Sequence, residues 1–134
     1  MTWDANATSI ISTSDDRSAK IWQDIWNSPV CTTLYGHTAR VWKSRWIGEV
    51  QWCHQEVGNE PHRAQLVLTC SEDMTCRLWN VTTSECVGIY HGHTGKNVWG
   101  ICADSTRHMA VSTGADGAVK VITISTSCLC SLWY

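Results

Sequence analysis

Two histidines and two aspartates stand at spacings where acid–base chemistry has to be considered. His37 and His93 each follow a glycine, and Asp73 and Asp116 lie 43 residues apart. Imidazole and carboxylate side chains are the usual general acids and bases, but a general acid–base pair of carboxylates needs a second carboxylate at matching spacing. No second carboxylate shares the spacing of these two aspartates. We therefore expect a structural, hydrogen-bonding role for these residues and predict no enzymatic activity.

Three segments of the chain share one pattern around an aspartate. Each has a serine or threonine four residues before the aspartate and a closing aromatic or apolar residue six residues after it. The members are Ser12, Asp16 and Trp22; Thr69, Asp73 and Trp79; and Ser112, Asp116 and Ile122. Gly-His-Thr stands at 36–38 and again at 92–94. Polar clusters beside each aspartate are typical of tight turns, so each copy predicts a β-hairpin.

The composition is that of a folded domain with a core. Of the 134 residues, 43% are hydrophobic and 16% are charged, which excludes a disordered chain. The formal net charge of −2 argues against a strong overall attraction to nucleic acid or anionic lipid. Neither a secretory signal nor an apolar run long enough for a membrane helix occurs. We expect a cytoplasmic protein with reduced cysteines, in which Cys70, Cys76 and Cys102 act as small buried hydrophobes in strands.

The repeated pattern resembles the WD-repeat family, whose units open with Gly-His and close with Trp. This resemblance implies an all-β, incomplete propeller of about three four-stranded antiparallel blades, at about 1–35, 36–91 and 92–134. It also implies a His–Ser/Thr–Asp–Trp hydrogen-bond network within each blade. The network is complete in the middle copy, with His37, Thr69, Asp73 and Trp79. The first copy lacks Gly-His, and the third has Ile122 where the family has Trp.

A narrower resemblance points to a partner. The strings at 36–46 and 92–101 are similar to those of the large WD-repeat proteins that assist a tRNA 2′-O-methyltransferase acting on the wobble nucleotide of the anticodon. The resemblance implies a non-catalytic scaffold that meets tRNA through the complex. The alternative is a generic WD-repeat interaction module with an unrelated protein partner.

A basic cluster interleaved with tryptophans is the second candidate surface. It consists of Arg40, Lys43 and Arg45 beside Trp42 and Trp46, with Lys96 at the equivalent entry to the third copy. Basic and aromatic side chains together suit a protein partner or RNA, and the alternative is a solvated strand face. We expect Arg40 and Lys96 to lie near one rim of the propeller.

The interval from Asp16 to Asp73 is 57 residues, and the extra residues fall in the segment 47–65. Its glycines, asparagine and proline predict a loop. Cys53, His54 and His62 lie within it, but their spacing fits no usual zinc pattern, so we expect neither a metal nor a cofactor.

We also expect the chain to begin at or just before the second strand of a blade and to end, over 123–134, in an outer strand. Such a wedge is either a fragment of a longer protein or a chain that closes by self-association.

Overall fold

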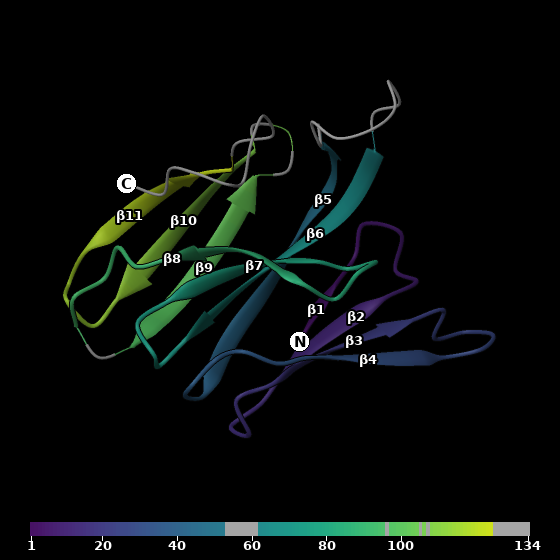
Figure 1. Cartoon of the computed structure of the whole chain (residues 1–134), viewed down its shortest axis with the longest axis horizontal. Helices are drawn as coiled ribbons and strands as arrows, with labels where there is room; N and C mark the ends of the chain where they lie inside the picture. The colour runs from purple at the N-terminus through teal and green to yellow at the C-terminus, as the bar shows by residue number, and fades with distance from the viewer. Residues whose placement is uncertain (53–61, 96, 105, 107, 125–134) are drawn as a thin grey trace.

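The computed structural model describes residues 1–52, 62–95, 97–104, 106 and 108–124, and the regular elements in this part are all β-strands (Figure 1). The first sheet has the order β1 (Thr2–Trp3), β2 (Ile10–Thr13), β3 (Ala19–Gln23) and β4 (Val30–Leu34). The middle sheet has the order β5 (Val41–Trp52), β6 (His62–Ser71), β7 (Cys76–Asn80) and β8 (Cys86–Tyr90). The third sheet contains β9 (Val98–Asp104), β10 (Met109–Gly114) and β11 (Val119–Thr123).

The all-β prediction is therefore confirmed, as three antiparallel sheets in an open arrangement (Figure 1). The first two sheets have four strands, and the third has three in the described part of the chain. The outer strand predicted over 123–134 falls mostly outside the described residues. We predicted a start at or just before the second strand of a blade; the structure has a two-residue first strand there, in which Thr2 and Trp3 of β1 pair with Ile11 and Ile10 of β2.

One turn design joins the second and third strands of every sheet. In each turn a backbone hydrogen bond closes the hairpin, from Ser14 N to Ser18 O in the first sheet and from Ser71 N to Thr75 O in the middle one. The residue after the repeated aspartate has a positive φ in each case, namely Arg17, Met74 and Gly117. This left-handed conformation is unfavourable for side chains other than glycine, and the closed turn must stabilise it at the first two positions.

The described parts of the inserted segment, 47–52 and 62–65, are strand and not the loop that we predicted, while 53–61 lie outside the described residues. β5 continues to Trp52 and β6 starts at His62, so this pair of strands is longer than its equivalents in the other sheets. The pairing shifts by one residue between Trp46 and Gly48, and Gly48 has a φ of 97°. This bulge resets the alternation of side chains, so that Ile47 and Val50 both point into the core. The cysteine and one histidine considered as zinc ligands, Cys53 and His54, lie outside the described residues.

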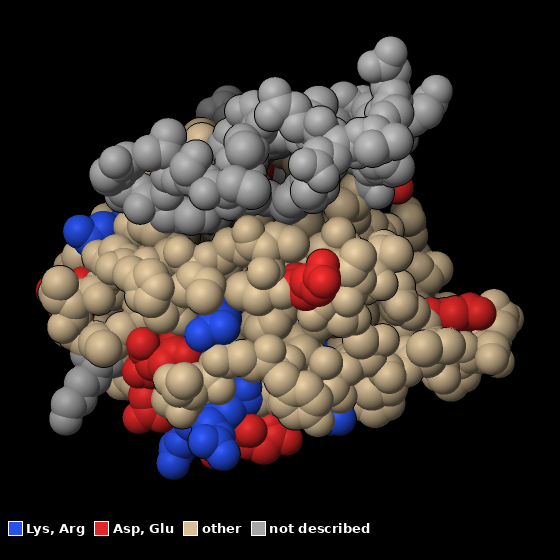
Figure 2. All heavy atoms as spheres, viewed as in Figure 1, with Lys and Arg blue, Asp and Glu red and all other residues tan. Residues whose placement is uncertain are grey.

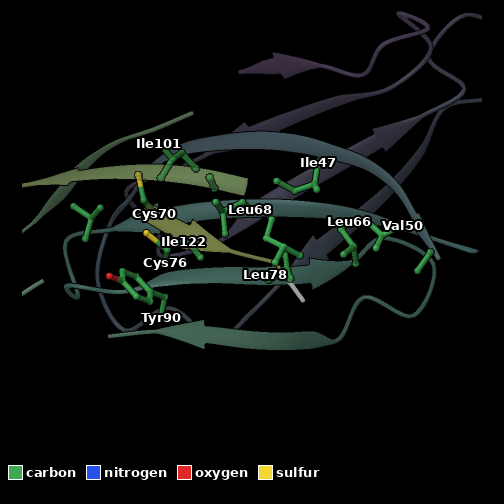
Figure 3. Packing of buried hydrophobic residues seen from close by; sticks show 14 residues of the cluster. Ile47, Val50, Leu66, Leu68, Cys70, Cys76, Leu78, Tyr90, Ile101 and Ile122 are labelled. Atoms are coloured by element: carbon green, nitrogen blue, oxygen red, sulfur yellow. The ribbon is translucent and has the colours of Figure 1, made fainter. Parts of the chain in front are cut away.

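The core consists of two layers, one on each face of the middle sheet. Between the middle and third sheets lie Leu66, Leu68 and Leu78, packed with Ile101 and Ile122 (Figure 3). Between the first and middle sheets lies a separate cluster, which contains Ile11, Ala19, Ile21, Leu34, Val67, Trp79 and Val81. Successive side chains in a strand point to opposite faces, which explains why Val67 and Leu68 belong to different layers.

Two of the three cysteines that we predicted to be buried in strands are buried in the structure. Cys70 and Cys76 are buried, and burial raises the pKa of each thiol to about 12, so both remain protonated and unreactive. Cys102 was wrongly placed: it is in β9, but its side chain is exposed on the outer face of the third sheet. Within the described part of the chain, no helix has the length and apolarity needed to cross a membrane.

Candidate functional site

The middle sheet contains a continuous chain of buried hydrogen bonds. Trp79 Nε1 donates to Thr69 Oγ1 at 2.8 Å, Thr69 Oγ1 lies 2.8 Å from His37 Nε2, and His37 Nδ1 lies 2.8 Å from Asp73 Oδ2. A neutral imidazole with its proton on Nδ1 gives every bond a donor and an acceptor, all aligned in one direction. Aligned bonds of this kind strengthen one another in a buried environment.

Asp73 has no free lone pair to offer a substrate. Besides the imidazole, its carboxylate accepts from the backbone N–H of Thr38 and from both the N–H and the hydroxyl of Thr75. Burial raises the pKa of Asp73, but the hydrogen bonds from His37 and Thr75 outweigh it and hold the pKa well below its usual value. The group is thus an ionised anchor for the turn and not a proton carrier at neutral pH.

The third sheet repeats this arrangement without the indole. His93 Nδ1 lies 3.0 Å from both carboxylate oxygens of Asp116, and His93 Nε2 lies 2.8 Å from Ser112 Oγ. A backbone hydrogen bond from Ala118 and the bond from His93 lower the pKa of Asp116 to about 2. Ile122 occupies the closing position and is buried, so an apolar contact replaces the donor that tryptophan supplies in the middle sheet.

The first sheet keeps only the two ends of the network. Trp22 Nε1 donates to Ser12 Oγ at 3.1 Å, while Asp16 accepts from the N–H and the hydroxyl of Ser18. The hydrogen bonds from Ser18 lower the pKa of Asp16. No histidine joins the two halves, and Trp22 is only partly buried.

Replacing Trp22 with phenylalanine is expected to lower the free energy of unfolding by less than about 0.5 kcal/mol, since the bond it removes is partly exposed to water. The same change at Trp79 is expected to lower it by about 1–2 kcal/mol, because a fully buried hydroxyl then loses its donor. Urea unfolding monitored by far-UV circular dichroism measures both. Equal losses at the two positions would contradict the difference in burial.

A glycine is required at position 36, directly before the histidine of the hydrogen-bond network in the middle sheet. Gly36 has a φ of 153°, and a Cβ at this position would lie 2.7 Å from Arg77 Nη1 and 3.1 Å from the Trp79 ring. The backbone therefore passes directly over the indole, which only glycine permits. This contact explains why the histidine of the motif is preceded by glycine in this copy.

The sheets meet at one edge, which we call the rim. It consists of the hairpin turns 14–18, 71–75 and 114–118 together with residues 35–40, 91–95 and 97 of the connections between sheets. The connection 35–40 is bonded on both sides, because Val41 N donates to Ser14 O and Glu72 N donates to Arg40 O. Ala115 N donates to Asn97 O in the same way at the third sheet. The rim is therefore a rigid surface built from the ends of all three sheets.

The structure separates the basic residues grouped from the sequence. Arg40 lies on the rim between two carboxylates, with Nη1 4.0 Å from Asp15 Oδ2 and Nε 3.7 Å from Glu72 Oε2, and about half of its side chain is exposed. Figure 2 shows basic and acidic side chains gathered together near the lower edge of that view. Mixed charge of this kind is more suited to a protein surface than to a phosphate backbone.

Lys43 and Arg45 lie beyond the rim, within β5, and Lys96 is outside the described residues. Lys43 and Arg45, together with Trp42, line a shallow depression of about 300 Å³. Trp42 also packs against Trp99, with ring centroids 5.2 Å apart. The two tryptophans that recur after Gly-His thus contact each other across the first strands of neighbouring sheets.

Three exposed groups escaped the sequence analysis. Tyr35 is 77% exposed at the start of the connection 35–40, and Asp15 and Glu72 flank Arg40. Trp3 stacks on Trp26, with centroids 6.4 Å apart and the ring planes inclined by 13°. The repeat spacing could have identified Trp3, since it stands 43 residues before Trp46.

The described residues contain no cluster of three His, Cys, Asp or Glu side chains that could hold a metal ion. The two histidines with carboxylate partners are engaged at both ring nitrogens. The two buried histidines and their aspartates therefore hold the turns in place, and the rim is an exposed surface beside them.

Antiparallel sheets side by side, with this histidine–aspartate frame in the middle and third of them, define a WD-repeat module. The chain belongs to the WD40 family: the family model "WD domain, G-beta repeat" matches residues 1–23, 28–80 and 84–123. Modules of this family generally serve as non-catalytic surfaces for protein partners.

Known proteins similar to this chain are diverse. The nuclear distribution protein PAC1 of Arthroderma otae is 28% identical over 88% of the chain and 24% of its own length. Eukaryotic translation initiation factor 3 subunit I of Vanderwaltozyma polyspora is 32% identical over 51% of the chain and 19% of its own length. The chain thus spans about a quarter or less of these relatives.

Among solved structures, the WD40 β-propeller domain of Doa1 superimposes with a TM-score of 0.63 at 24% identity. The match covers 87% of this chain and 33% of that domain's chain. It shows a shared fold.

Proposed function

We propose that this chain is a protein-binding module whose partner docks on the rim, and that its partner is a tRNA 2′-O-methyltransferase. The observation that carries the docking proposal is the connection 35–40. Hydrogen bonds to the first and middle sheets fix its backbone, while Tyr35 and Arg40 remain exposed. A preorganised surface with an exposed aromatic ring and an arginine has the composition of a binding hot spot.

The methyltransferase is proposed from the sequence strings around Arg40 and around Asn97, which are similar to those of its WD-repeat partners. In this proposal the chain supplies positioning and no catalytic group, and it acts in the cytoplasm. The enzyme brings the tRNA, which agrees with the mixed charge around Arg40 and with the net charge of −2.

Replacing Arg40 with glutamate is expected to weaken partner binding about tenfold, because the new carboxylate joins Asp15 and Glu72 in a negative cluster. Isothermal titration of the purified chain with the purified methyltransferase measures the change. Glu85→Lys reverses a charge in the β7–β8 turn, at the opposite end of the sheet, and is expected to leave affinity unchanged. Equal effects of both variants would contradict docking on the rim.

Disruption of the gene tests the partner itself. Loss of 2′-O-methylation at the wobble nucleotide, read by mass spectrometry of tRNA, is the expected result. An unchanged tRNA profile would overturn the methyltransferase assignment. The second candidate, a module for an unrelated protein, would then be favoured by the diversity of the relatives.

A further inference from the structure

Two sheet faces are uncovered in the described part of the chain, and they lie at opposite sides of the molecule. The first sheet presents the aromatic face, which we define as Trp3, Ile10, Trp22 and Cys31. These residues form one row, since Trp3 pairs with Ile10, Ile10 with Trp22 and Trp22 with Cys31. Trp3 is 51% exposed, and the stacked ring of Trp26 extends the row.

The third sheet presents the valine face, which we define as Val111, Val119 and Val121. Val111 and Val121 are direct partners on β10 and β11. Val119 is 66% and Val121 59% exposed, although their β-branched side chains are typical of sheet interiors. An exposed row of this kind on a folded protein usually marks an interaction site.

The middle sheet shows what covers a face of the aromatic type. Its row Trp46, Val67, Trp79 and Cys86 has the same pairing as the aromatic face and the same residue types, except that Val67 stands where the aromatic face has Ile10. There, however, the row is packed against the first sheet, and Val67 and Trp79 are essentially fully buried. The surface that receives this row is formed by Ile11, Ala19, Ile21 and Leu34.

The valine face occupies the same positions as that receiving surface. Ile11 and Val111 each precede the repeated aspartate by five residues, and Ala19 and Val119 each follow it by three. Ile21 and Val121 each follow it by five. The chain therefore carries an uncovered copy of both halves of its own internal interface.

We propose that the valine face binds the aromatic face of a second copy of this chain, head to tail, in the geometry of the first and middle sheets. Two copies contribute three sheets each, and the resulting six fall within the four to eight that close a propeller. A head-to-tail contact forms a ring when the rotation closes, and in a ring of two copies each face is used once per chain.

Sedimentation equilibrium of the purified 134-residue chain in reducing buffer tests the proposal. A dimer of about 30 kDa is expected, twice the 15.0 kDa of one chain. Reducing conditions exclude disulfides through the exposed Cys31 and Cys102. A monomer at the highest soluble concentration would overturn the proposal, and a further sheet of a longer chain would then be the occupant.

Two variants distinguish head-to-tail from symmetric contact. Val121→Glu disables the valine face and Trp3→Glu the aromatic face, and both sites are exposed enough for each monomer to fold, which circular dichroism verifies. Each variant alone is expected to be monomeric, whereas an equimolar mixture regains one intact contact and forms dimers. Met74→Asp, in an exposed turn outside both faces, is expected to remain dimeric. Dimers of either single variant, or a mixture that stays monomeric, would overturn the arrangement.

Discussion

Replacing Trp79 with alanine is expected to lower the free energy of unfolding by about 3–5 kcal/mol. The indole is 1% exposed and lies between the first and middle sheets, so its removal leaves a cavity that fixed strands on both sides cannot fill. The change also leaves Thr69 Oγ1 without its indole donor inside the core. Urea unfolding followed by circular dichroism measures the loss.

The comparison with Trp79→Phe separates packing from hydrogen bonding. Phenylalanine fills most of the volume and removes only the donor, so its loss is expected to stay near 1–2 kcal/mol. Ile122, which closes the third network without any donor and is still buried, shows that the position tolerates an apolar group. An alanine variant no less stable than the phenylalanine variant would contradict the role of Trp79 in packing.

Replacing Asp73 with asparagine is expected to cost about 2–4 kcal/mol at neutral pH. The amide presents an N–H group where the imidazole, Thr38 or Thr75 already donates, so at least one buried donor loses its acceptor. Chemical unfolding at pH 7 measures this loss. Asp16→Asn provides the control, because that carboxylate is exposed and is expected to contribute less.

The pH dependence follows from the same carboxylates. The folded-state pKa values of Asp73 and Asp116 lie below the unfolded value of about 3.9. Their contribution is therefore complete above the unfolded pKa and is lost as the pH falls through the folded pKa, which for Asp116 is about 2. Stability is expected to decline between about pH 5 and pH 2, and less steeply in Asp73→Asn. Parallel curves for the two proteins would contradict the assignment.

The frame of the structure follows from local spacing. A serine or threonine, a turn aspartate and a closing residue at fixed intervals must meet across a hairpin, because strands alternate with period two and the turn sets their register. The spacing of Thr69, Asp73 and Trp79 therefore predicted a hairpin, and the family resemblance implied their hydrogen bonds. His37 required the family resemblance, since it reaches them from the end of another sheet.

The remaining errors concern properties that depend on distant residues. Residues 47–52 and 62–65 pair as strands where their glycines predicted a loop, and Gly48 is accommodated there by a bulge. Cys102 has the sequence pattern of a core residue, yet its burial depends on whether another sheet covers β9. The carboxylates beside Arg40 come from two other turns, so the charge of the rim could not be read from the basic cluster alone.

The connection 35–40 has a consequence for how the chain unfolds. His37 follows the last strand of the first sheet and is hydrogen-bonded to Asp73 in a turn of the middle sheet. Nearby, Val41 N donates to Ser14 O of the first sheet, and Arg40 O accepts from Glu72 N of the middle sheet. Repeat proteins gain stability from the coupling between neighbours as well as from each unit. Here that coupling includes a buried, directional bond in addition to apolar contact. We therefore expect the first and middle sheets to open together as one cooperative unit, because separating them breaks the hydrogen bond between His37 and Asp73.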